Sequence, residues 1–156
     1  SERARETLFN WLNNDISNAR CLDLFAGTGS LGFEALSRGA LSVTFVEKIK
    51  QAALLITETA KLFGVNDQEV NNQDALSFLR TKNDQLYDIV FLDPPFSHNI
   101  LGEVIGLLYQ GNWLSKNALI YIELDIDQNL PELPGDWHLS HKKIFSNVCF
   151  ALIKVN

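Results

Sequence analysis

Cysteine and histidine are scarce in this sequence, and long apolar runs are absent. Its 156 residues include two cysteines and three histidines, and neither cysteine has a Cys or His partner at close spacing. This argues against a disulfide framework and against a metal site. No run approaches the roughly 18 apolar residues that span a bilayer, and residues 1–6 lack the basic and then apolar pattern of a signal segment. We therefore expect a cytoplasmic protein without metal or membrane.

Basic residues are also few, since the formal net charge is −6. This argues mildly against a nucleic-acid partner, because phosphate neutralisation usually dominates such binding, but the local field at a site decides. We interpret three short basic clusters as ordinary solvated surface: Arg3 with Arg5, Lys48 with Lys50, and Lys142-Lys143 beside His141. The length and the 46% hydrophobic content predict one globular domain over residues 1–156.

Strand and helix patterns alternate along the chain, which predicts an α/β fold with a mostly parallel sheet and helices on both faces. The expected strands cover residues 19–24, 42–46, 69–71, 87–92 and 118–123. The expected helices cover residues 4–12, 30–38, 49–63, 75–80 and about 101–108. The third helix carries an apolar stripe at helical spacing, formed by Ile49, Ala53, Ile56, Ala60 and Phe63.

The C-terminal part breaks this alternation. Residues 137–143 and 148–155 have two strand patterns that only a short polar stretch separates, so no helix fits between them. We expect them to form an antiparallel hairpin at the sheet edge. A parallel sheet that ends in such a hairpin differs from the usual dinucleotide-binding layout.

Residues 27–32, Gly-Thr-Gly-Ser-Leu-Gly, match the pattern G-x-G-x-x-G between a strand and a helix. Glycines let the backbone turn sharply and approach a ligand closely, so we favour a nucleoside-bearing cofactor over a purely structural turn. The sequence has no Gly-Lys-Ser/Thr, which excludes a nucleoside triphosphate loop.

Three carboxylates lie at or near strand ends, and each has two possible roles. Asp23 either holds the glycine loop through backbone N–H groups or meets an amine of the cofactor, since a buried acid needs a partner. Glu47 either binds ribose hydroxyls or interacts with the dipole of the next helix; we favour ribose. Asp74 is an N-cap for the short helix after it and can also reach the exocyclic amine of an adenine.

Residues 93–96, Asp-Pro-Pro-Phe, follow the apolar run 89–92 and give the strongest functional signal. The Asp93 carboxylate and the Pro94 carbonyl can accept both N–H groups of an amine on a heteroaromatic ring, which localises the nitrogen lone pair for attack on an activated methyl group. The prolines fix the backbone, and Phe96 can stack on the base. We expect methylation of a nucleobase amine. Whether Asp93 removes the proton or only polarises the amine stays open here.

With these residues the chain resembles the class I S-adenosylmethionine-dependent methyltransferases. More narrowly, it resembles the bacterial 16S ribosomal RNA guanine-N2 methyltransferases of the RsmD type. The segments that carry the resemblance are 5–12, 22–32, 34–40, 45–47 and 93–96. The last segment is general to amino-methylating enzymes, whereas the first and third give the narrower family. The resemblance implies a Rossmann-like three-layer sandwich with a seven-stranded sheet, and S-adenosylmethionine as cofactor.

The resemblance also implies which residues bind each group. Cofactor contacts are expected from Asp23, Phe25, Ala26, Gly27, Gly29, Glu47, Lys48, Asp74, Ala75 and Asp93. Among these, Asp23 and the glycines lie at the methionine end, Glu47 at the ribose, and Asp74 with Ala75 at the adenine. The catalytic residues are expected to be Asp93, Pro94 and Phe96. Substrate contacts are expected from Arg5, Pro95 and Phe96, with the guanine flipped out of its stack.

The implied partner is ribosomal RNA or a small-subunit assembly intermediate, bound by a monomer. Family members usually begin with a further stretch that includes basic residues, so we expect an N-terminal extension to be missing from this sequence. The rival hypotheses are a DNA adenine or cytosine amino-methyltransferase, a nicotinamide-dependent oxidoreductase and a non-catalytic binding module. The first usually carries a target-recognition segment, for which the chain has no room, and residues 93–96 are not expected in the second.

Overall fold

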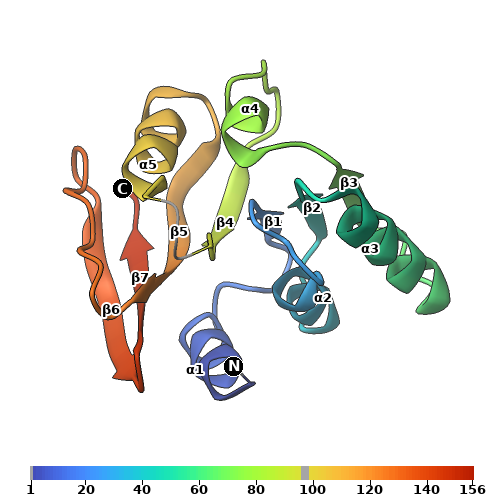
Figure 1. Cartoon of the computed structure of the whole chain (residues 1–156), viewed down its shortest axis with the longest axis horizontal. Helices are drawn as coiled ribbons and strands as arrows, with labels where there is room; N and C mark the ends of the chain where they lie inside the picture. The colour runs from blue at the N-terminus through green and yellow to red at the C-terminus, as the bar shows by residue number, and fades with distance from the viewer. Residues whose placement is uncertain (1, 96–98) are drawn as a thin grey trace.

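The computed structural model describes residues 2–95 and 99–156. Its centre is a seven-stranded sheet with the order β3-β2-β1-β4-β5-β7-β6 (Figure 1). The parallel strands are β1 (Arg20–Asp23), β2 (Ser42–Val46), β3 (Gln68–Asn71), β4 (Tyr87–Leu92) and β5 (Leu114–Asp125). The antiparallel strands are β6 (His138–Phe145) and β7 (Val148–Lys154). The predicted C-terminal hairpin is confirmed, with β7 paired to β5 and β6 at the edge.

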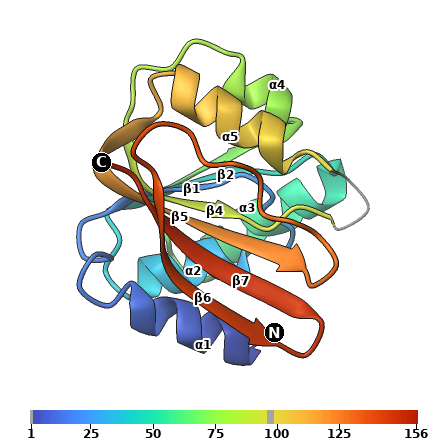
Figure 2. The same cartoon turned by 90° about the vertical axis from the view of Figure 1, so that its left-hand side faces the viewer.

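Helices cover both faces of the sheet, as predicted (Figures 1 and 2). One face carries α1 (Glu2–Trp11), α2 (Ser30–Ser37) and α3 (Lys50–Leu62), and the other carries α4 (Ala75–Leu79) and α5 (Leu101–Gln110). The strands therefore contribute to two cores. Leu22 and Val90 pack with α4 and α5, whereas Cys21 and Phe91 pack with α1 and α2, because successive strand residues face opposite sides.

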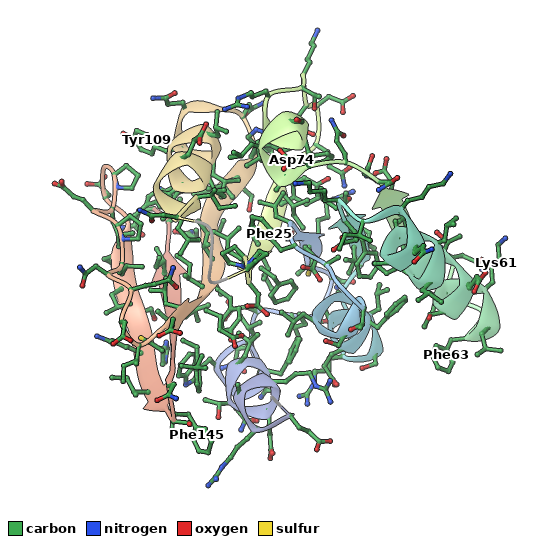
Figure 3. All side chains as sticks on the ribbon, viewed as in Figure 1. Phe25, Lys61, Phe63, Asp74, Tyr109 and Phe145 are labelled. Carbon is green, nitrogen blue, oxygen red and sulfur yellow. The ribbon has the colours of Figure 1, made fainter. Side chains whose placement is uncertain are left out.

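The predicted stripe of the third helix is wrong at both ends. Ala53 and Ile56 are buried, but Ile49 is 64% exposed and Phe63 is 68% exposed. The helix begins only after Ile49, whose backbone is extended, and Phe63 follows its last residue. Ile49 and Phe63 lie outside the helix, so the helical spacing of the stripe does not extend to them. Figure 3 shows Phe63 at the far end of α3.

The two cysteines lie in strands, where they act as small hydrophobic residues. Cys21 in β1 and Cys149 in β7 are buried free thiols, and burial raises the pKa of Cys21 to about 12. In the described part of the chain, every helix is too short or too polar to cross a bilayer.

Candidate active site

A cavity of about 540 Å³ opens beside the carboxyl ends of β1, β2 and β4. This is the position where open α/β sheets bind ligands, next to the strand at which the chain order reverses. Figure 3 labels two of its residues, Phe25 in the loop after β1 and Asp74 at the start of α4. The lining residues are Leu24, Phe25, Ala26, Gly27, Thr28, Ser30, Glu47, Lys48, Ile49, Asp74, Ala75, Leu76, Asp93, Pro94, Pro95 and Ile100.

Glu47 joins the glycine loop to the start of α3. Its Oε1 accepts a hydrogen bond from the Gly27 N–H at 2.8 Å, and its Oε2 accepts one from the Ile49 N–H at 2.7 Å. The side chain is buried, yet it lines the cavity. Each carboxylate oxygen can accept more than one hydrogen bond, so both roles predicted for Glu47 are compatible with this geometry.

The other two glycines of the motif, Gly29 and Gly32, are not among the residues that line the cavity. Gly29 precedes α2 with a φ of +84°, a left-handed conformation that glycine adopts without steric cost. A Cβ on Gly32 would lie 2.3 Å from the Phe45 ring, so this position needs glycine for close packing of α2 on β2. Gly29 is not among the lining residues, and its predicted contact with the cofactor stays a prediction.

Asp23 lies behind the glycine loop. Its side chain is 1% exposed and accepts hydrogen bonds from the backbone of Gly32 and Phe25. Within the described residues, its Oδ2 has no hydrogen-bond partner. Burial, followed by the charge of Asp93, raises the pKa of Asp23 to about 7. This geometry favours the first of the two roles predicted for Asp23, in which it holds the glycine loop. Its buried Oδ2 can accept a hydrogen bond from a further donor.

Asp74 combines a capping role with a place on the cavity wall. Its Oδ2 accepts a hydrogen bond from the Ser77 N–H at 3.1 Å, which caps α4 as predicted. Asp74 and the next residue, Ala75, also line the cavity. The capping bond fixes the carboxylate at this edge of the cavity.

Asp93 follows β4 directly and is half-buried, with Pro94 buried and Pro95 exposed. Burial, followed by the neighbouring charge of Glu123, raises the pKa of Asp93 to about 7. All three residues line the cavity. Phe96 and His98 lie outside the described residues, so the predicted stacking role of Phe96 stays a prediction.

A second, smaller hollow of about 270 Å³ lies on the α1 side of Asp93. Its lining residues are Glu2, Ala4, Arg5, Ser30, Leu31, Asp93, Tyr121 and Glu123. Asp93 and Ser30 line both hollows. Arg5, predicted to contact the substrate, is placed here, where it also approaches the carboxylates of Glu2 at 4.0 Å and Glu34 at 3.7 Å.

Comparison with known proteins places the chain in a family. The family model described as "Conserved hypothetical protein 95" matches residues 1–154. The chain belongs to this family. Ribosomal RNA small subunit methyltransferase D of Haemophilus influenzae is 45% identical to it over 154 residues, which cover 97% of this chain and 79% of that protein. The protein of the same name from Escherichia coli is 41% identical over 152 residues, which cover 97% and 76%.

The fold comparison agrees. The solved structure of yhhF from Escherichia coli has a TM-score of 0.94 and 40% identity, covering 99% of this chain and 86% of that one. The chain is therefore a methyltransferase with the Rossmann-like fold predicted from the sequence, and its cofactor is S-adenosylmethionine.

The larger cavity suits this cofactor. Its volume lies within the range of about 300–1,000 Å³ that is typical of small-molecule sites. The cavity presents three carboxylates, Glu47, Asp74 and Asp93, against one lysine, Lys48. Carboxylates accept hydrogen bonds from hydroxyl, amino and ammonium groups but repel phosphates. The lining therefore fits a cationic nucleoside better than a dinucleotide with its pyrophosphate.

Sequence reasoning missed two functional candidates in the smaller hollow, Tyr121 and Glu123. A usable signal existed, because Glu123 ends the strand predicted at 118–123, and the carboxyl ends of parallel strands meet at one edge of the sheet. The same rule identified Glu47 and Asp93.

Proposed function

We propose that this methyltransferase transfers a methyl group to the exocyclic N2 amine of a guanine in 16S ribosomal RNA. The observation that carries the proposal is the position of Asp93 on a wall common to the two hollows. A methyl donor in the larger cavity and a nucleobase in the smaller hollow would both contact the Asp93 carboxylate. The relatives named ribosomal RNA small subunit methyltransferase D support this RNA as the substrate.

The chemistry places two requirements on the protein. S-adenosylmethionine supplies an electrophilic methyl group when bound. The guanine amine is a poor nucleophile, because its lone pair is delocalised into the ring. The Asp93 carboxylate and the Pro94 carbonyl accept hydrogen bonds from the two N–H groups of the amine and so orient its nitrogen. After attack the nitrogen must lose a proton, and the pKa of about 7 suits Asp93 as the acceptor near neutral pH.

The remaining cofactor contacts follow from the lining of the larger cavity. We assign Glu47 to the ribose hydroxyls and Asp74 with Ala75 to the adenine. Phe25, Ala26, Gly27 and Lys48 line the same cavity. Asp23 acts from behind the loop, where its free Oδ2 can take a further donor.

We further propose a monomer that works in the cytoplasm as a single domain over residues 1–156. Its substrate is 16S ribosomal RNA or a small-subunit assembly intermediate. Arg5 lines the smaller hollow, which is assigned to the substrate base. Pro95 and Phe96 are assigned substrate contacts from their place in the motif, Phe96 by stacking.

The test is labelled methyl transfer to unmodified 16S ribosomal RNA, with mapping of the product base. Asp93→Ala should lower kcat by about 100-fold or more, because it removes both a positioning and a proton-accepting group. The variant should still bind S-adenosylhomocysteine, which a thermal shift measures. Asp84→Ala, in an exposed loop, is the matched control. Unchanged turnover of Asp93→Ala, or a product base other than guanine, contradicts the proposal.

A further inference from the structure

Glu123 stands beside Asp93 on the adjacent strand. The parallel pairing of β4 with β5 joins Leu92 to Ile122, so the next residue of each strand, Asp93 and Glu123, are neighbours. Paired strands lie about 4.8 Å apart. Because side chains alternate, both residues share the side of the sheet that carries Phe91 and Tyr121, which pack in the core under α1. Both carboxylates line the smaller hollow.

The Glu123 carboxylate is oriented by its own strand. The Tyr121 hydroxyl donates a hydrogen bond to Oε2 at 3.0 Å, and the Tyr121 side chain is fully buried. Among residues 2–95 and 99–156, no cation pairs with Glu123, and Arg5 on the same wall pairs with Glu2 and Glu34. Oε1 of Glu123 is therefore available to a donor in the hollow.

We propose that Glu123 accepts a hydrogen bond from the N1–H of the target guanine and so selects guanine over the other amino-bearing bases. The inference rests on the proposed function. If Asp93 accepts from the N2 amine, the neighbouring carboxylate faces the next ring position, N1. Enzymes that flip a base read it along this Watson–Crick edge.

The selectivity follows from the base chemistry. Guanine carries a donor, N1–H, next to its amine. Adenine and cytosine carry an acceptor lone pair at the corresponding ring nitrogen, which a carboxylate repels. A site built for a donor rejects an analogue that lacks it, because a buried acceptor is left unpaired. Glu123 would therefore act as a specificity-determining residue, separate from the methyl transfer that Asp93 assists.

The test compares two substrates after the product base has been mapped. One is 16S ribosomal RNA with guanosine at the target position, and the other carries 2-aminopurine there, introduced by ligation. 2-Aminopurine keeps the N2 amine but has an acceptor at N1. The readout is kcat/KM on each RNA for the wild type, Glu123→Gln and the control Glu58→Gln, whose side chain is exposed on α3.

Wild type and Glu58→Gln should prefer guanosine over 2-aminopurine by about tenfold or more. Glu123→Gln presents an amide N–H to N1, so its preference should fall by about tenfold or reverse. Its thermal shift with S-adenosylhomocysteine should be unchanged. Tyr121→Phe, which keeps the carboxylate but removes the bond that orients it, should lower the preference by a smaller factor and serves if Glu123→Gln fails to fold.

The outcomes separate the two proposals. If the wild type methylates guanine N2 and Glu123→Gln has the same guanosine preference, the role of Glu123 is overturned and the proposed function stands. If only Tyr121→Phe folds, an unchanged guanosine preference in that variant has the same meaning. Absence of guanine N2 methylation by the wild type overturns the proposed function itself, and the role of Glu123 with it.

Discussion

Asp93 must be ionised to accept hydrogen bonds and a proton, yet burial and then Glu123 raise its pKa to about 7. Below that pH the ionised fraction falls about tenfold per unit. We expect kcat/KM to rise with pH up to about 7 and then to level off. Glu123→Gln removes one cause of the shift and should move the midpoint to lower pH. A pH profile of methyl transfer measures both effects, and a flat profile from pH 5.5 to 7.5 contradicts the role of Asp93.

The pKa of Asp23 leads to a second prediction, on how the free energy of unfolding depends on pH. Burial raises its pKa from 3.8 to about 7, so between these values the folded protein holds a proton that the unfolded chain has lost. The contribution of Asp23 to the free energy of unfolding therefore decreases as pH rises through this window. Asp23→Asn should remove this dependence and change the difference in unfolding free energy between pH 5 and pH 8 by about 1 kcal/mol or more.

Urea unfolding of both proteins at the two pH values measures the effect. Asp84→Asn, at an exposed position, should leave the pH dependence of the wild type unchanged. Equal pH dependence in wild type and Asp23→Asn would mean that Asp23 is ionised in the folded protein at pH 5.

At the scale of elements, the packing of α2 against β2 depends on one missing side chain. A Cβ at Gly32 would lie 2.3 Å from the Phe45 ring and 2.9 Å from Val43. Gly32→Ala should lower the free energy of unfolding by about 1–3 kcal/mol, the usual cost of overpacking a core. Gly106→Ala in α5 is the matched control, because its Cβ meets nothing within 4 Å and alanine favours the helix by about 0.5–1 kcal/mol. Chemical denaturation of both variants checks this, and equal stability would refute the packing role.

The elements themselves were predicted where pattern and burial agree. Strands at 42–46 and 87–92 coincide with β2 and β4, because both are mostly apolar and buried on both faces. The strand predicted at 118–123 is too short, since β5 begins at Leu114. The three residues after Leu114, which are Ser115, Lys116 and Asn117, are polar and at least partly exposed, and Asn117 has a φ of +63°, so no apolar period marks this part of the strand.

The candidate site was predictable to a similar depth. Glu47, Asp74 and Asp93 were found from their places at strand ends, and all three line the cavity. The burial of Asp23, which is 1% exposed, could not be predicted from its place in the strand. Glu123 was missed although it also ends a predicted strand, and the pairing of β4 with β5 is what shows that it neighbours Asp93.

At the scale of the whole molecule, the acidic lining of the larger cavity distinguishes two nucleoside-containing ligands. S-adenosylhomocysteine should raise Tm by a few degrees at a concentration well above its Kd, because a ligand that binds only the folded state stabilises it. NAD should leave Tm unchanged, because its pyrophosphate would meet Glu47, Asp74 and Asp93. Differential scanning fluorimetry with each ligand checks this, and stabilisation by NAD alone would reject the assignment of the cavity.

The common wall at Asp93 also has a consequence for inhibitor chemistry. A purine tethered to an adenosine analogue through a short amine linker could occupy the two hollows together, with the linker nitrogen against that carboxylate. Joining the two halves raises the effective concentration of the second one, so even weakly held fragments would combine into a tight and selective compound.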